Sequence, residues 1–467
     1  MKLKAGTEEQ YTYSHQCLQA LFTPKCGRKG FSPPKCGRKG KRKRVIERFV
    51  KHIGPLNRHS WIHAKVGVYQ ARCNCCKFFQ AEIEGVPYKG HYSYAVRDAV
   101  ANAVIRDRMP YELVREKMRE DHFLKLSIGY VHACFLWAHE QIHMDTYWDF
   151  VRAKFSGILC IDEVHDGAWT ILFATDPLND FTVSFSLVEQ NDQDHMDVFL
   201  QSLKDRGLEV VVAITDGSPL YKDSLQKWWT EIEHQLCIFH VIKQVNKLIL
   251  DGVRDIKNRI KRQGNKGRKR RRGRPSKSAQ QQRQARKGMT KKEQATFIWD
   301  HQYLIVKKQE DLTDQDQQDL AVMLEIAPQL KLFRQFNHQF YRLFQRGVTR
   351  QQARYRRTQM QNNQHYLDNA FLAKALKKLK KESFEKMITF LSWENVERTN
   401  NHVERNNRSF RRMQKTRYKR RKKHTIEKAL ELNLYARMLR HPLYHSQPDV
   451  RPIHLAIPGD VTLKMAA

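Results

Sequence analysis

Long apolar runs are missing from this 467-residue chain. No stretch approaches the roughly 18 apolar residues that cross a membrane, and the start, MKLKAGTEEQ, has neither an apolar core nor a cleavage signal. The nine cysteines are odd in number and irregularly spaced, unlike a disulfide framework. We therefore expect a cytoplasmic protein with reduced or metal-binding thiols, and neither a secreted nor a membrane protein.

Acidic residues are scarce beside basic ones. The chain has 49 Asp and Glu against 85 Lys and Arg, for a formal charge of +36. Such an excess attracts a polyanion, so nucleic acid is the first partner to consider. A packaging protein could be as basic, but 40% hydrophobic residues with 23 Phe, 17 Tyr and 8 Trp suffice for a large core. Charge alone does not separate an enzyme from a packaging protein.

Small modules are expected in the first 150 residues. Residues 1–90 are basic and weakly cored, and they contain the hexapeptide KCGRKG twice. Residues 91–150 have helical periodicity that breaks at Met109 and Pro110. Three helices, the last from about Ser127, would form a DNA-binding helix-turn-helix. An ordinary helical spacer explains the pattern equally well.

From Ser156 the periodicity changes to that of strands. GILCID, WTILFATD and FTVSFSLVE are predicted strands. After them come a helix at about 194–205, the strand LEVVVAITD, a helix with two tryptophans, the short strand HQLCIF and a helix near His240. Three strands, helix, strand, helix, strand, helix is the element order of a ribonuclease H-like α/β core. We predict that residues 151–255 form its first part.

The remainder of this core is expected after an interruption. No acidic residue occurs between Asp255 and Glu293, which indicates a solvated linker, and the following residues have helical periodicity without strand signals. A single helix from about Asn400 to Met438 would complete the core. The predicted divisions are a basic linker at 256–292, an all-α insertion at 293–392, the end of the core at 393–440 and a tail at 441–467.

Two aspartates follow predicted strands. Asp162 comes after the apolar residues 158–161, and Asp216 comes after residues 210–215, with Gly217 leaving room beside it. Carboxylates at strand C-termini project into a shared crevice, where they can bind hard divalent cations. Two such ions can neutralise the attacking and leaving oxygens of a phosphodiester. One aspartate at a strand end is usually the start of a loop. Two aspartates, one on the first and one on the fourth strand, are stronger evidence for a metal site.

The motifs in order resemble those of a known family. ILCIDEVH, VVAITDGSPLY, HQLCIFHVIKQV and TNNHVERNNRSFRRMQKTR are similar to the signatures of DDE transposases of the Mutator-like and related bacterial insertion-sequence groups, over roughly residues 155–440. The resemblance implies that Asp162, Asp216 and Glu404 are catalytic and bind two Mg²⁺ or Mn²⁺ ions. It also implies that double-stranded DNA at an element's ends is cut and joined to target DNA.

The same resemblance assigns supporting residues. It matches Asn401, three residues before Glu404, to an asparagine of the family, and Cys237 with His240 to its Cys-x-x-His element. Two ligands without a second pair do not complete a zinc site. We therefore expect Cys237 and His240 to pack and to hydrogen-bond near the active site.

A second glutamate, Glu397, competes with Glu404, because ENVERTNNHVERNNR contains two Val-Glu-Arg triplets. On one helix the two would share a face about 10 Å apart, so only one could reach the aspartates. Asn401 and Arg408 flank Glu404 at helical spacing. Glu397 lies where the helix is expected to begin, which is typical of a first-turn acid. We expect Glu404 to complete the triad.

Basic side chains are expected to bind DNA in two places. One is an Arg-Gly-Arg-Pro segment that resembles an AT-hook core, although a generic phosphate-binding patch explains it as well. The other is the helix after Glu404, whose positive charges suit DNA phosphates. The candidates are Arg272, Arg274, Arg405, Arg408, Arg411, Arg412, Lys415 and Arg417.

The N-terminal cysteines offer a possible zinc site. Cys73 and Cys76 form a Cys-x-x-Cys half-site, and Cys26 and Cys36 could supply the other half. Related transposases often begin with a zinc-binding module, such as a zinc ribbon. Here the upstream pair is degenerate, so Zn²⁺ and buried thiols stay equal alternatives.

The sequence predicts a transposase that acts as a homo-oligomer on DNA and associates with the nucleoid. One alternative is an inactive, transposase-derived DNA-binding regulator, which would need no acidic triad. Another is a structure-specific nuclease with the same core, which would cut DNA without joining it.

Overall fold

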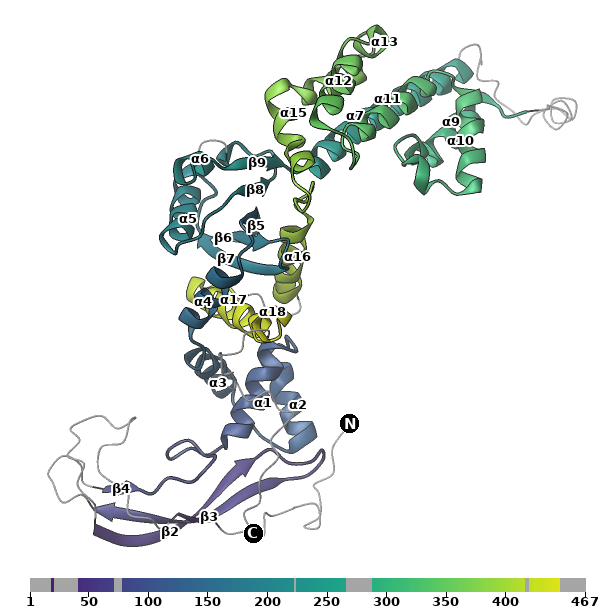
Figure 1. The fold of residues 1–467 in the computed structure, drawn as a ribbon. Coiled ribbons are helices and arrows are strands. Elements are labelled where there is room, and N and C mark those ends of the chain that lie inside the picture. The colour runs from purple at the N-terminus through teal and green to yellow at the C-terminus, as the bar shows by residue number, and fades with distance from the viewer. Residues whose placement is uncertain are drawn as a thin grey trace, which may run out of the picture. The chain divides into compact units, whose positions relative to one another are not determined.

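The computed structural model describes residues 18–20, 41–70, 78–221, 224–265, 288–415 and 420–445. The chain divides into two compact units, the first comprising Met1–Lys154 with Arg408–Ala467 and the second Phe155–Asn407. Figure 1 shows their elements, coloured along the chain. Within the described ranges no helix has the length and apolar character needed to cross a membrane.

The first unit begins with a small sheet. β2 (Lys41–His52) and β3 (Ser60–Gln70) pair antiparallel over most of their length. β1 (Leu18–Ala20) pairs parallel with β3, and β4 (Phe78–Gln80) pairs antiparallel with it. One face is apolar and closes a small core of Val50, Ala64, Val66, Tyr69, Ala81, Ile83 and Val86.

The other described elements of the first unit are helices. Ser93 and Ser127 cap two of them, with hydroxyls that accept hydrogen bonds from Val96 N and Tyr130 N, and Pro110 directly precedes the helix between them. Three helices therefore lie where the sequence predicted them; the helix-turn-helix role remains a prediction. The helices are α1 (Tyr94–Ile105), α2 (Tyr111–His122), α3 (Ile128–Glu140), α4 (Met144–Lys154), α17 (Lys423–Met438) and α18 (Pro442–His445).

A mixed five-stranded sheet forms the centre of the second unit, in the order β7-β6-β5-β8-β9. β5 (Ile158–Asp166), β6 (Trp169–Asp176) and β7 (Phe181–Val188) are antiparallel neighbours. β8 (Val212–Thr215) and β9 (Glu233–Leu236) extend the sheet parallel to β5. The connecting elements are α5 (Gln193–Asp205), η2 (Pro219–Tyr221) and α6 (Ser224–Trp228), and α7 (Ile238–Asn265) follows β9. This is the element order predicted from the periodicity.

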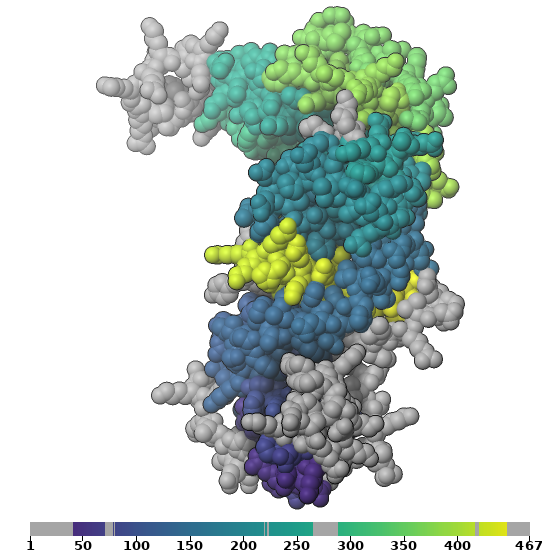
Figure 2. Space-filling view, turned by 90° about the vertical axis from the view of Figure 1, so that its left-hand side faces the viewer, coloured from purple at the N-terminus to yellow at the C-terminus, as the bar shows by residue number. Residues whose placement is uncertain are grey.

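Every described element between residues 288 and 392 is helical. The space-filling view shows this insertion, in green, next to the core of the second unit (Figure 2). The C-terminal end of the insertion is hydrogen-bonded to Gln235 of β9. Gln235 Nε2 donates to Met387 O at 3.0 Å, and Phe390 N donates to Gln235 Oε1 at 2.8 Å. The elements are α9 (Lys291–Asp300), η3 (Gln302–Ile305), η4 (Gln309–Asp311), α10 (Asp314–Ile326), α11 (Leu330–Arg342), α12 (Arg350–Gln361), α13 (Gln364–Leu367), α14 (Ala370–Leu376), η5 (Lys377–Leu379), α15 (Lys381–Met387) and η6 (Thr389–Ser392).

Two helix boundaries differ from the sequence prediction. α7 continues to Asn265, into the segment expected to be linker, because Ile256 and Ile260 extend its buried face. The single helix expected from Asn400 to Met438 is wrong. α16 (Asn401–Lys415) and α17 are separate helices, and residues 420–422 between them are not helical. Consecutive basic side chains supply no apolar face there and repel one another, which disfavours a continuous helix.

Candidate active site

Asp162 lies within β5, and not at its end as the sequence predicted. The reason is that β6 stays paired with β5 as far as Asp166. The parallel neighbour β8 behaves differently, since its pairing with β5 ends at Cys160 and Ile214. Asp216 comes directly after the last residue of β8. Both aspartates therefore lie where the parallel part of the sheet ends, the edge at which α/β sheets form their sites.

Four carboxylates interact at this edge. Burial and, after it, the negative charges of Glu163, Asp216 and Glu404 raise the pKa of Asp162 to about 7, against a backbone N–H from Glu163 that lowers it. Asn407 Nδ2 donates to Asp162 Oδ2 at 2.8 Å. The three acids selected from the sequence are thus close enough for two of them to shift the ionisation of the third.

The turn after β8 orients Asp216 and connects it to Glu163. Ser218 N donates to Asp216 Oδ1 at 2.8 Å. Tyr221, fully buried in η2, donates its hydroxyl to Glu163 Oε2 at 2.5 Å, and Asn191 Nδ2 donates to Glu163 Oε1 at 3.1 Å. Burial, then the charges of Glu163, Asp216 and Asp162, raise the pKa of Tyr221 well above its usual value. Tyr221 therefore acts here as a neutral hydrogen-bond donor.

Glu404 lies in the first turn of α16, and Asn400 anchors that turn to the sheet. Asn400 is fully buried, and its Nδ2 donates to Ile161 O at 2.8 Å, directly before Asp162. Its backbone N–H donates to Cys237 Sγ at 3.2 Å, and its carbonyl accepts from Glu404 N at 3.2 Å. The buried asparagine thus holds the start of the glutamate helix against β5.

Two asparagines that were not selected from the sequence, Asn400 and Asn407, lie on the same helix face as Glu404. Asn401, matched to the family's asparagine, is exposed at the start of α16. Asn400 and Asn407 are buried and form the contacts with β5. Since positions 400, 404 and 407 share one helix face, these residues and Glu404 lie together.

Cys237 directly precedes α7, and His240 lies in the first turn of α7, near the start of α16. Cys237 is buried, its N–H donates to Thr215 O at 2.8 Å, and burial raises the pKa of its thiol. His240 Nε2 lies 3.8 Å from Glu404 Oε1. Its Nδ1 is buried and has no hydrogen-bond partner among the described residues. Both side chains therefore lie next to Glu404.

Glu397 occupies a different place. It is exposed and precedes α16, so it does not share a helix with Glu404. Its charge acts on the buried Cys160, whereas Glu404 is among the charges that raise the pKa of Asp162. The geometry favours Glu404 as the partner of the two aspartates.

Several residues of this arrangement were not selected from the sequence. Glu163 directly follows Asp162 and could have been noticed as a second acid, and Tyr221 closes the phrase ITDGSPLY. Asn191, Asn400 and Asn407 gave no separate signal. Their roles depend on contacts between segments far apart in the chain.

Carboxylate oxygens are the ligands that hard divalent cations prefer. Among the described side chains, no group of three or more His, Cys, Asp or Glu is already arranged around one metal position. Asp162, Asp216 and Glu404 nevertheless supply the oxygen donors that Mg²⁺ and Mn²⁺ prefer, and a cation would offset the burial and the like charges that raise the pKa of Asp162. The zinc candidates Cys26, Cys36, Cys73 and Cys76 lie outside the described residues.

The basic residues of α16 face outwards. Val403, Phe410 and Met413 form its buried side. The DNA-binding candidates Arg405, Arg408, Arg411, Arg412 and Lys415 are all exposed. Arg405 also lies 3.5 Å from Asp180. Three further candidates, Arg272, Arg274 and Arg417, lie outside the described residues.

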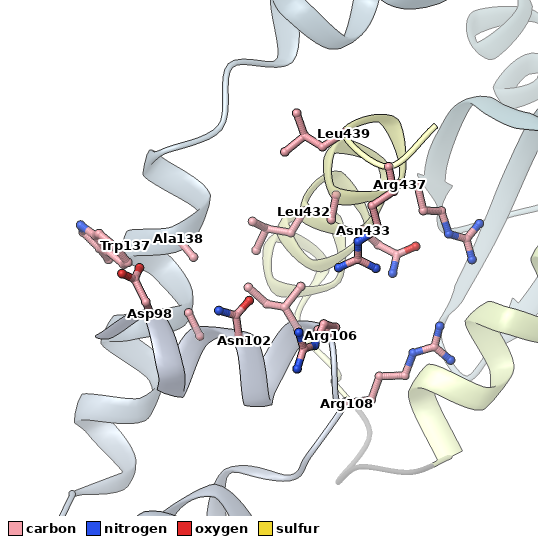
Figure 3. Close-up of a pocket in the computed structure, with 14 residues that line it drawn as sticks. Asp98, Asn102, Arg106, Arg108, Trp137, Ala138, Leu432, Asn433, Arg437 and Leu439 are labelled. Carbon is pink, nitrogen blue, oxygen red and sulfur yellow. The ribbon is translucent and has the colours of Figure 1, made fainter. Parts of the chain in front are cut away.

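A pocket of about 150 Å³ in the first unit, lined by α1, α3 and α17, gathers more arginines. Figure 3 shows Arg106, Arg108 and Arg437 at one end, and Asp98, whose pKa burial raises to about 6, at the other. Arg108 Nη2 and Arg437 Nη2 donate to the same hydroxyl, Ser409 Oγ, at 3.2 and 2.8 Å. The sequence did not indicate this cluster because its members come from segments far apart in the chain.

The second unit thus combines a mixed β-sheet with acidic side chains where its parallel strands end, an arrangement typical of α/β enzymes. A family model described as transposase, DDE_Tnp_ISL3, matches residues 159–422, more than half of the chain. The chain belongs to this transposase family. Among solved structures, the Drosophila P element transposase strand transfer complex is similar at 11% identity, covering 73% of this chain and 92% of that one, with a TM-score of 0.39. No curated protein matches the chain significantly.

Proposed function

We propose that this transposase cleaves DNA at the ends of an insertion sequence and joins the freed end to target DNA. Its catalytic acids are Asp162, Asp216 and Glu404. The observation that supports this assignment is that Asn407 and Asn400, on the face of Glu404, donate to Asp162 and to Ile161, while Asp216 directly follows the neighbouring strand β8. After burial and Glu163, the charges of Asp216 and Glu404 also raise the pKa of Asp162. The strand order β7-β6-β5-β8-β9 supports a ribonuclease H-like core, which the sequence predicted for this region.

The three carboxylates would hold two Mg²⁺ or Mn²⁺ ions. Bound there, the ions would neutralise charge on the attacking and leaving oxygens of the phosphodiester. The protein's own contribution is orientation. Asn407 fixes the Asp162 carboxylate, Ser218 N fixes that of Asp216, and Asn400 holds the helix turn of Glu404. Hydrogen-bonded supports of this kind keep ligands in place before the substrate arrives.

DNA binding would use the exposed arginines of α16 and the arginine pocket of the first unit. Arg108 and Arg437 converge on a neutral hydroxyl, so a phosphate oxygen could be bound beside Ser409. Double-stranded DNA of the element ends and of the target is the proposed partner. Assembly of a homo-oligomer on DNA is part of the same proposal.

Separate cleavage, joining and binding assays on the element's end DNA test this function. Asp162→Asn and Asp216→Asn should abolish nicking and strand transfer with Mg²⁺ or Mn²⁺ while gel-shift affinity stays within about twofold, because each removes a metal ligand and no phosphate contact. Asp205→Asn, at an exposed position of α5, is the matched control and should nick normally. Nicking at a comparable rate by either active-site variant would refute the assignment. Wild-type nicking without joining would instead indicate a nuclease.

A further inference from the structure

The second unit contains a cleft outside the candidate active site. It lies between α7, η3 and α11 and consists of two adjoining cavities of about 700 and 180 Å³. Lys308, Tyr341 and Arg398 line both cavities, so the two cavities lie side by side. Its larger part has the size of a pocket that binds small organic groups.

The cleft begins where the candidate active site ends. Its lining includes Ile238, Phe239, Arg398 and Thr399, and Ile238 N donates to Arg398 O at 3.1 Å. His240 directly follows Phe239, and Asn400 directly follows Thr399. Both His240 and Asn400 contact Glu404. The Phe239 and His240 rings are 5.9 Å apart, edge to face. A DNA strand held at the carboxylates would therefore have this cleft beside it.

Two aromatic rings of the cleft are open to solvent. Phe239 is 43% exposed and Tyr303 is 65% exposed. Ile242, Leu250 and Val306 add apolar walls. Exposed aromatic rings in a DNA-processing protein are surfaces on which unpaired bases stack, whatever their sequence.

Positive charge surrounds these rings. Lys243 and Lys247 are exposed one helical turn apart on α7, and in the described part of the chain neither pairs with a carboxylate. The two acids of the lining are already neutralised: Asp251 lies 2.8 Å from Arg254, and Glu310 lies 3.2 Å from Lys308. The cleft thus favours an anionic occupant such as a phosphodiester chain.

A polar group in the lining of the larger cavity has an unused acceptor. Asn246 Nδ2 donates to Tyr341 OH at 3.4 Å, while its Oδ1 is buried and lacks a hydrogen-bond partner among the described residues. A buried acceptor without a partner is costly, so a ligand that donates to it is favoured. The exocyclic amino groups and ring N–H groups of nucleobases are such donors.

We propose that this cleft binds unpaired nucleotides of single-stranded DNA next to the phosphate that is cut. The inference rests on the proposed function and adds that the DNA is opened at this point. Phe239 and Tyr303 stack on the bases, and Lys243 and Lys247 bind the flanking phosphates. Bases inside a duplex are stacked on one another, so they reach these rings only after they leave the helix.

Fluorescence anisotropy of the full-length protein with a labelled thymidine oligonucleotide tests the cleft. Phe239→Ala and Tyr303→Ala should each weaken single-strand binding roughly tenfold or more, because each removes a stacking surface. Phe239→Trp should retain wild-type affinity. Tyr355→Ala is the matched control, since this ring is 66% exposed on α12 outside the cleft. Lys243→Gln should also lower the salt dependence of binding, by about 0.7 in slope.

Unchanged single-strand affinity in both Phe239→Ala and Tyr303→Ala, with normal circular dichroism, would overturn the inference and point to a protein partner for this surface. The outcome is independent of catalysis: Asp162→Asn should bind the oligonucleotide like the wild type. If Asp162→Asn still cut DNA, the proposed catalytic function would be refuted. Single-strand binding in the cleft would still be tested by the anisotropy measurements. A 2-aminopurine beside the cleavage site should unstack on binding to wild type and stay stacked with Phe239→Ala.

Discussion

Asn407 donates a hydrogen bond of 2.8 Å to Asp162, 245 positions earlier in the chain. The bond connects the helix of Glu404 to the strand of Asp162, and Asn400 repeats the connection one residue before Asp162. Asp162 and Glu404 repel each other when both are charged. The two asparagines therefore hold together segments that electrostatics alone would separate, which is a common property of binding sites.

Asn407→Ala should lower the rate of DNA cleavage by about 10- to 100-fold, because the Asp162 carboxylate loses its orienting donor. Loss of a donor to the charged form also raises the pKa of Asp162 further. The rising limb of the pH–rate profile should therefore move to higher pH, which a purely structural defect would not cause. Asn401→Ala is the matched control on the same helix and should leave both rate and profile unchanged. An unshifted profile for Asn407→Ala would contradict the positioning role.

Asp162→Asn should make the protein more stable at pH 8 and leave stability at pH 4 nearly unchanged. The pKa of Asp162 is raised from 3.8 to about 7 in the folded protein, so the native state binds more protons than the unfolded state between these values. Stability is then lost as pH rises through this window. Removing the charge should recover up to about 4 kcal/mol at pH 8, since one pKa unit corresponds to about 1.4 kcal/mol. Thermal melts at both pH values measure this, and a destabilised variant at pH 8 would show that Asp162 is not electrostatically strained.

Glu404→Gln should eliminate strand cleavage, whereas Glu397→Gln should retain most of it. The charge of Glu404 is among those that raise the pKa of Asp162, and Glu404 lies beside His240. Glu397 is exposed and precedes α16. The two variants are each other's control, because both occur in a Val-Glu-Arg triplet. A side-by-side nicking assay decides between them, and the reverse result would move the triad to Glu397.

Replacing Arg408, Arg411 and Arg412 with Gln should reduce the salt dependence of duplex binding. Each phosphate contact contributes about −0.9 to the slope of log K against log salt, so the loss approaches 2.7 if all three bind phosphates. The control variant replaces Lys331, Lys374 and Lys377, exposed lysines of the insertion, with Gln. Equal slopes for the two variants would mean that the exposed side of α16 does not touch DNA.

Local patterns in the sequence predicted the sheet but not the contacts across it. The apolar runs of β5 and β8 and the position of Asp216 after β8 depend on neighbouring residues, and these were recognised. Asp162 falls inside β5 because β6 remains paired beyond it, which periodicity does not indicate. The roles of Asn400 and Asn407, and the meeting of Arg108 with Arg437 at Ser409, join segments that are distant in sequence. Only the folded chain brings them together.

The metal dependence of Asp216→Cys tests directly whether this carboxylate binds a catalytic ion. A thiolate is a poor ligand for Mg²⁺ and a better one for the softer Mn²⁺. If Asp216 binds a catalytic ion, this variant should not cleave the element's end with Mg²⁺ and should regain measurable cleavage with Mn²⁺. Wild-type cleavage by Asp216→Cys in Mg²⁺ would contradict the assignment of Asp216 as a metal ligand.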